Sequence, residues 1–142
     1  MTMSLKKAFN ICLLIFGIIL PSMAQVSQAT IEKREKRKNL TIKEWNTNEA
    51  TKSKYLDHVT TYDDKGRKTE ETEYANYGMK ERTTYEYDEK GLCIKEVVYN
   101  SHNKPYRIRK FEYNADGTKK TQYNYLPNGK LETTKVFEYI FK

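Results

Sequence analysis

The stretch YEYDEKGLCIKEVVY, residues 85–99, places a turn signal between two runs rich in aromatic and β-branched side chains. Asp at the first position of a four-residue turn and Gly at the fourth favour a type I turn closed by a left-handed residue. In a β-strand, successive side chains point to opposite faces, so alternating polar and apolar residues are typical of one. The stretch therefore predicts a β-hairpin with its turn at residues 88–91.

The same turn frame recurs along the chain at steps of 12 to 14 residues. Its copies lie at residues 63–66, 75–78, 88–91, 100–103, 114–117 and 126–129. The residues that define the clearest turns are Asp63, Gly66, Asp88, Gly91, Asn114, Gly117, Asn128 and Gly129. Short strands at this spacing predict an all-β antiparallel meander. We expect seven strands, at about residues 55–62, 67–74, 80–87, 92–99, 105–113, 118–125 and 130–140, and an eighth at residues 40–45.

Pairing across the turns predicts that the sheet has one aromatic face and one polar face. A three-residue loop pairs the first residue of a turn with the residue after its Gly, which sets Tyr87 opposite Cys93. Carried forward, this pairing assigns to the aromatic face Tyr85, Tyr87, Cys93, Val97, Tyr99, Phe111, Tyr113, Tyr123, Tyr125, Leu131, Phe137 and Tyr139. The polar face then carries mainly Lys, Arg, Glu, Gln and Thr.

The weakest turn, at residues 75–78, needs a different loop to keep this pattern. A four-residue loop at residues 76–79, which pairs Ala75 with Lys80, leaves Tyr62 and Tyr74 on the aromatic face, and register follows the apolar pattern. Three alternatives stay open for what covers this face: the sheet curls, a partner chain packs on it, or residues 26–54 lie across it. A fourth is that the tyrosines stay partly solvated, since their hydroxyls reach water.

The N-terminus has the pattern of a secretory signal peptide. Lys6 and Lys7 precede an apolar run at residues 8–20, and small residues end the segment at Ala24. The alternative is a membrane anchor, but a run of 13 residues is shorter than the roughly 20 needed to span a bilayer. We expect cleavage after Ala24 and a periplasmic or secreted chain, whose only contact with the membrane is the transient signal peptide.

After the expected cleavage site the chain divides into a tether and one domain. Residues 25–39 are rich in charge and lack an apolar period, so we expect a charged linker, either solvated or a short frayed helix. Residues 40–142 are expected to form a single β-repeat domain. Aromatic residues make up 13% of the chain, and disordered chains are poor in aromatics, which argues for a folded domain.

The inventory of catalytic residues is small. His58 and His102 are far apart in the sequence, and no pair of residues has metal-ligand spacing. The carboxylates of the turns already have a turn role and lack the calcium-binding ligand set of an EF-hand. Cys93 has no His near it in sequence and is expected to be a small apolar side chain. We therefore expect no enzyme activity, no cofactor and no metal site.

Several of these hairpins resemble known repeats. Residues 62–67 and 87–92, YDDKGR and YDEKGL, resemble the tyrosine-aspartate (YD) repeat of bacterial Rhs-type proteins, and residues 113–117 are a variant. Residues 125–131, YLPNGKL, are similar to the hairpins of MORN-type repeats. The overall combination resembles small exported Bacteroidota proteins of unknown function. That resemblance implies export and a β-sheet, and it implies no activity.

Two hypotheses of function follow from these patterns. The first is an exported, non-enzymatic interaction or structural protein, with an envelope or extracellular protein or glycan as its partner. In this hypothesis the strand at residues 130–140 is an exposed edge through which oligomers can form. The alternative is an exported carbohydrate- or peptide-binding module that uses the tyrosine-rich face. Its candidate residues are Tyr85, Tyr87, Tyr113, Tyr123 and Tyr125. Although 26 basic residues exceed 19 acidic ones, export argues against a nucleic-acid partner.

Overall fold

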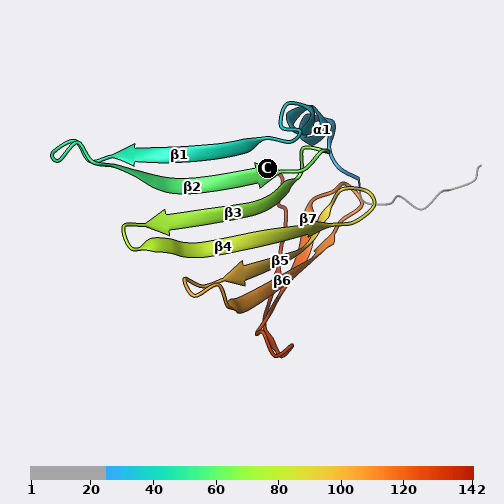
Figure 1. The fold of residues 1–142 in the computed structure, drawn as a ribbon. Coiled ribbons are helices and arrows are strands. Elements are labelled where there is room, and N and C mark those ends of the chain that lie inside the picture. The colour runs from blue at the N-terminus through green and yellow to red at the C-terminus, as the bar shows by residue number, and fades with distance from the viewer. Residues whose placement is uncertain (1–24) are drawn as a thin grey trace, which may run out of the picture.

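The computed structural model describes residues 25–142, so the expected signal peptide at residues 1–24 lies outside the described residues. These described residues form one eight-stranded antiparallel sheet whose strands follow one another in sequence order (Figure 1). The elements are α1 (Gln28–Glu35), β1 (Thr41–Thr47), β2 (Lys54–Tyr62), β3 (Lys68–Ala75), β4 (Gly78–Tyr87), β5 (Cys93–Tyr99), β6 (Pro105–Tyr113), β7 (Lys119–Tyr125) and β8 (Leu131–Val136). The predicted all-β meander is confirmed, and β1 is the expected eighth strand.

Five of the six predicted turns close with the expected three-residue loop. At the turn of residues 88–91, the Asp88 amide donates to the Leu92 carbonyl at 2.9 Å, and the Gly91 amide donates to the Asp88 carbonyl at 3.0 Å. The Asp88 carboxylate also accepts bonds from the amides of Lys90 and Leu92. The residue that closes each of these turns has a positive φ, and these residues are Gly66, Gly91, Asn103, Gly117 and Gly129.

The hairpin between β3 and β4 differs from the prediction. The structure pairs Ala75 with Gly78 and Tyr74 with Met79, so the expected four-residue loop pairing Ala75 with Lys80 is wrong. Gly78 adopts a φ of 116°, which residues other than Gly rarely adopt. The chain reverses through only the two residues Asn76 and Tyr77. Register at this hairpin follows the geometry of the turn, because Tyr74 is not buried deeply enough to decide it.

A second irregularity accompanies every hairpin and overturns the predicted division of the faces. Beyond each turn the returning strand carries one extra residue that has no cross-strand partner. The extra residues are Asp57, Thr69, Lys80, Ile94, Tyr106, Lys120 and Glu132. Tyr87 pairs with Cys93 as predicted, but Tyr85 then pairs with Glu96. A bulge of one residue moves all later side chains of the returning strand to the other face.

The aromatic side chains are therefore shared between the two faces of the sheet. Cross-strand partners point to the same side, and we name the faces after Phe111 and Tyr123, which the register places on opposite sides. The Phe111 face carries Tyr85, Tyr87, Cys93, Phe111 and Tyr113. The Tyr123 face carries Val97, Tyr99, Tyr123, Tyr125 and Leu131. The single aromatic face expected from the sequence does not form.

The buried core of the described chain is small. Its buried apolar side chains are Tyr62, Leu92, Val98 and Phe111, and only Val98 is fully enclosed. Figure 1 shows the sheet twisting and curling from β1 toward β7, with α1 lying beyond the ends of β2 and β3. Within residues 25–142 no second layer of helices or strands packs against either face of the sheet, whereas most domains bury a sheet face against another element.

The charged segment before β1 lies against the turns. α1 begins at the N-cap Ser27, whose hydroxyl accepts a bond from the Thr30 amide. Arg34 donates to the Gly91 carbonyl at 2.8 Å, and Arg37 donates to the Tyr62 hydroxyl at 2.9 Å. Arginine side chains therefore fasten this segment to the sheet, although it has no apolar face.

Candidate functional site

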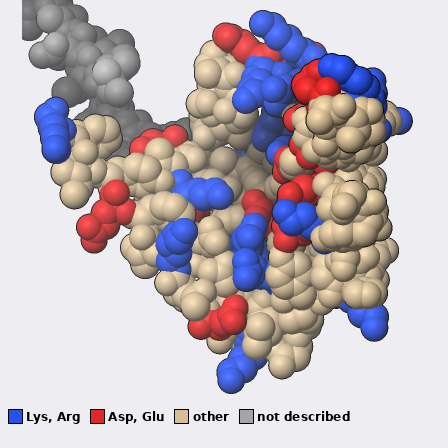
Figure 2. All heavy atoms as spheres, turned by 90° about the vertical axis from the view of Figure 1, so that its left-hand side faces the viewer, with Lys and Arg blue, Asp and Glu red and all other residues tan. Residues whose placement is uncertain are grey.

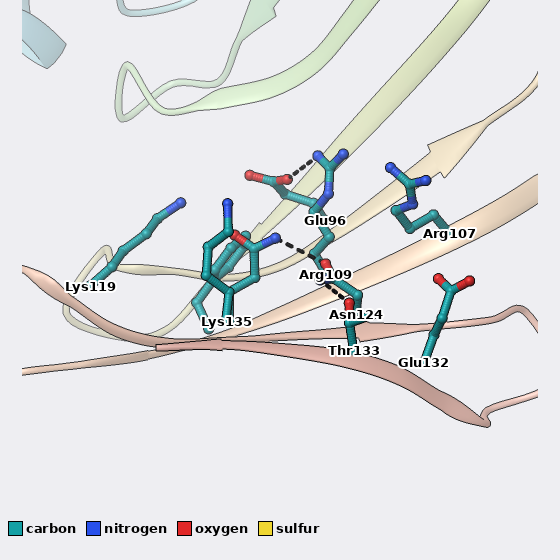
Figure 3. A pocket seen from close by; sticks show the side chains of 10 residues that line it. Glu96, Arg107, Arg109, Lys119, Asn124, Glu132, Thr133 and Lys135 are labelled. Atoms are coloured by element: carbon teal, nitrogen blue, oxygen red, sulfur yellow. Dashed lines mark hydrogen bonds and ion pairs between the residues drawn. The ribbon is translucent and has the colours of Figure 1, made fainter. Parts of the chain in front are cut away.

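A groove of about 650 Å³ lies over β5–β8. It contains four cationic side chains, Arg107, Arg109, Lys119 and Lys135, against two carboxylates, Glu96 and Glu132. Its remaining lining residues are Phe111, Gln122, Asn124 and Thr133. Figure 3 shows the labelled side chains standing on one side of the strands, with Arg107 and Lys119 at opposite ends of the row.

The register of the four strands brings these side chains together. Glu96 of β5 pairs with Arg109 of β6, which in turn pairs with Asn124 of β7. Asn124 pairs with Thr133 of β8, so all four lie side by side on the Phe111 face. This row exists only because of the bulges, since without them the strands would pair in a different register.

One ion pair neutralises part of the groove. The Arg109 guanidinium lies 3.0 Å from the Glu96 carboxylate, and only 15% of the Glu96 side chain is exposed. The ion pairs of residues 25–142 include none to Arg107, Lys119 or Lys135. Arg107, Lys119 and Lys135 therefore have no carboxylate oxygen of the described chain within 4.0 Å, and Glu132 of the same lining makes no ion pair either.

The floor of the groove is polar. The Gln122 amide donates to the Asn124 side-chain oxygen at 2.9 Å, and the Asn124 amide donates to the Thr133 hydroxyl at 2.8 Å. Phe111 is only 7% exposed, and the Lys119 ammonium lies 4.0 Å from the centre of its ring. The single aromatic ring of the groove is thus covered by a cation, and a ligand would meet charged groups, amides and a hydroxyl.

The five tyrosines that the sequence suggested as a binding face do not form one platform. Tyr85, Tyr87 and Tyr113 lie on the Phe111 face, whereas Tyr123 and Tyr125 lie on the opposite face. The Tyr85 hydroxyl donates to Glu71 at 2.9 Å. Burial, followed by this bond to Glu71, raises the pKa of Tyr85 above its ordinary value.

Tyr87 and Tyr113 hold neighbouring hairpins together. The Tyr87 hydroxyl donates to the Lys68 carbonyl at 2.8 Å, and the Tyr113 hydroxyl donates to the Cys93 carbonyl at 2.5 Å. Each accepting residue lies two positions after the Gly that closes a turn: Lys68 follows Gly66, and Cys93 follows Gly91. Burial raises the pKa of Tyr87 to about 12. Their position and bonds make these tyrosines structural.

A second hollow, of about 420 Å³, lies where the N-terminal segment meets the turns, and it contains Cys93. Burial, with a further contribution from the Glu96 charge, raises the pKa of the Cys93 thiol to about 11. A thiol with a raised pKa carries little thiolate near neutral pH and is a poor nucleophile. The geometry therefore gives Cys93 a packing role.

The two histidines lie apart. His58 Nδ1 lies 2.8 Å from the Asp57 carboxylate, and His102 is exposed in the turn at residues 100–103. Within residues 25–142, no three His, Cys, Asp or Glu side chains lie where they could share a metal ion. The same residues contain no helix with the length and apolar character needed to cross a membrane.

The groove is the feature that sequence reasoning missed. Arg107, Arg109 and Lys135 are ordinary basic residues of strands that alternate with other polar residues, and no motif marks them. Only the bulged register places them beside one another. No family model and no curated protein matches the chain, so the resemblance to YD and MORN-type hairpins stays a resemblance.

Proposed function

We propose that this protein is an exported, non-enzymatic interaction protein that binds its partner in the groove over β5–β8. The observation that carries the proposal is the row of cations on an otherwise unlayered sheet. Arg107, Lys119 and Lys135 stand in a hollow with no carboxylate partner in the described chain. Export is supported by the signal-peptide pattern of residues 1–24, which implies a periplasmic or secreted location.

The open sheet supports a binding role over a catalytic one. Catalysis needs a nucleophile or an acid–base pair within hydrogen-bond reach of a reacting group. The groove contains no His, Cys or Ser, and its carboxylates are Glu96, bonded to Arg109, and the exposed Glu132. Such a surface can attract and orient an acidic ligand without changing it.

Lysine footprinting of the chain from Gln25 to Lys142, which contains every described element, tests the proposal. Acetylation of each lysine is compared with and without an envelope extract of the organism that encodes the chain. We expect protection of Lys119 and Lys135, and unchanged labelling of Lys65 and Lys90 in the exposed turns. Equal labelling of all four lysines with and without the extract would contradict the proposal.

A second candidate function is assembly through the edge strand β8. Every residue of β8 is exposed, and the apolar side chains of Ile140 and Phe141 beyond it are 82% and 93% exposed. Unpaired strand edges are templates for another strand. Deletion of residues 140–142 removes the exposed Ile140 and Phe141 and keeps the Tyr139 hydroxyl bond to the Lys119 carbonyl, so it tests the apolar tail beside the edge without disturbing β7. If this tail supports assembly at the β8 edge, light scattering should show a smaller mass after the deletion.

A further inference from the structure

The spread of the groove cations is the first clue to the chemistry of the ligand. Arg107 and Arg109 lie on β6, Lys119 on β7 and Lys135 on β8. Neighbouring strands are about 4.8 Å apart, so these charges extend over a distance of roughly 10 Å across the sheet. They do not converge on a single point as the donors of a phosphate site do. This arrangement suits a chain that carries several negative charges.

The polar floor is the second clue. The side chains of Gln122, Asn124 and Thr133 are linked by hydrogen bonds. Gln122 and Asn124 each donate only one of their two amide hydrogens in these bonds, so other donors and acceptors remain for a ligand. Groups that both donate and accept hydrogen bonds, such as sugar hydroxyls, match such a surface. The cations beside this row match carboxylates on the same sugars.

The third clue is the kind of contact that the groove does not offer. Peptides are commonly anchored by side chains that fill apolar pockets, and single-stranded nucleic acids stack their bases on exposed aromatic rings. The only aromatic residue in the lining is Phe111, which is buried beneath the Lys119 ammonium. The described lining thus favours a ligand recognised through charge and hydroxyl groups.

We infer that the groove binds an acidic polysaccharide segment, through carboxylates at Arg107, Lys119 and Lys135 and sugar hydroxyls at Gln122, Asn124 and Thr133. This inference rests on the proposed function, because it names the ligand class of the same groove. Figure 2 shows Lys and Arg interspersed with Asp and Glu on the side of the molecule it presents, so a polyanion would meet mixed charge there. The groove provides the local excess of positive charge.

Calorimetry with a galacturonate hexamer tests the inference directly. The control ligand is the fully methyl-esterified hexamer, which has the same sugars without the negative charges. The chain carrying Arg107→Gln, Lys119→Gln and Lys135→Gln is compared with a matched control carrying Lys65→Gln, Lys90→Gln and Lys130→Gln, which loses the same charge from exposed turn positions. We expect the acidic hexamer to bind more tightly than the ester.

We further expect the groove variant to lose about tenfold in affinity, since three partly exposed ion pairs disappear together, and the turn variant to change little. Far-UV circular dichroism checks that both variants fold. Should the groove variant not fold, the single substitution Lys135→Gln at an exposed edge position provides the comparison.

Three results would overturn the inference. The first is no heat of binding with the acidic hexamer, and the second is equal loss of affinity in the groove and turn variants. The third is binding of hexaglutamate as tightly as galacturonate, which would assign the groove to acidic peptides. If galacturonate does not bind but the extract still protects Lys119 and Lys135 from acetylation, only the assignment of the ligand class is refuted. Failure of the footprint would remove the proposed function as well.

Discussion

Gly66 and Gly129 occupy equivalent positions in two hairpin turns, and the structure predicts that Ala costs much more at the first. Both have a positive φ, of 71° and 85°. A non-Gly residue in the left-handed region costs roughly 1–2 kcal/mol, and both variants bear this cost. A Cβ at Gly129 meets no atom within 4 Å, whereas a Cβ at Gly66 lies 1.9 Å from the Arg34 carbonyl oxygen.

The additional cost at Gly66 comes from displacing the N-terminal segment. The Arg34 carbonyl belongs to the backbone, so it must retreat by about 1 Å or more to reach ordinary contact distance. Three bonds depend on its present place: Asn39 N–H to the Asp63 carbonyl, Arg37 to the Tyr62 hydroxyl and Arg34 to the Gly91 carbonyl. At about 1 kcal/mol each, their loss adds about 3 kcal/mol to the cost of Gly66→Ala.

Urea unfolding followed by the fluorescence of Trp45, the single tryptophan, measures both variants. With a slope of about 1–3 kcal/mol/M, the difference should separate their midpoints by at least about 1 M. The decisive control is the chain that begins at Leu40, which lacks Arg34, the residue that holds the three atoms nearest to a Cβ at Gly66. There the two substitutions should cost the same. Equal costs in the longer chain, or a difference that survives the truncation, would refute the reasoning.

Three further predictions concern single side chains. Because burial raises the pKa of the Cys93 thiol to about 11 from 9.0, iodoacetamide at about pH 8 should alkylate the folded chain about a hundredfold more slowly than the urea-unfolded chain; equal rates would contradict the burial. The raised pKa of Tyr87 contributes stability that is fully present below pH 10 and is lost as pH rises through about 12, so urea midpoints should fall within this window, and Tyr87→Phe should reduce the fall. Asp88→Ala removes the acceptor for the amides of Lys90 and Leu92 and should cost about 1–2 kcal/mol in urea unfolding; Asp88→Asn, which keeps an acceptor oxygen, should cost less than half as much.

The turns could be predicted because their causes are local. Asp88 bonds amides two and four residues ahead, and Gly91 supplies the left-handed conformation, so the five residues 88–92 contain all these interactions. The same holds for the strand order, because tight turns between short strands leave a meander as the simple solution. Sequence reasoning was correct for these features.

Which side chains share a face of the sheet could not be predicted, because no particular amino-acid type marks the extra residue beside each turn. Ile94 and Lys120 both occupy this position, and neither differs in kind from its neighbours in the sequence. One unpaired residue reverses the face of every later side chain, so the predicted set that joined Tyr85 to Val97 was divided. The error arose from extending one correct pair, Tyr87 with Cys93, along a regular strand.

The sequence by itself determined the hairpins, their spacing and the absence of a familiar catalytic motif, since each depends on residues within one short stretch. The tertiary structure alone decided that Arg34 lies against Gly66 and that Glu96, Arg109 and Asn124 form one row. Those contacts join residues of different elements, and they depend on a register that the bulges set. The groove, and the function proposed for it, therefore become visible only when the strands are paired.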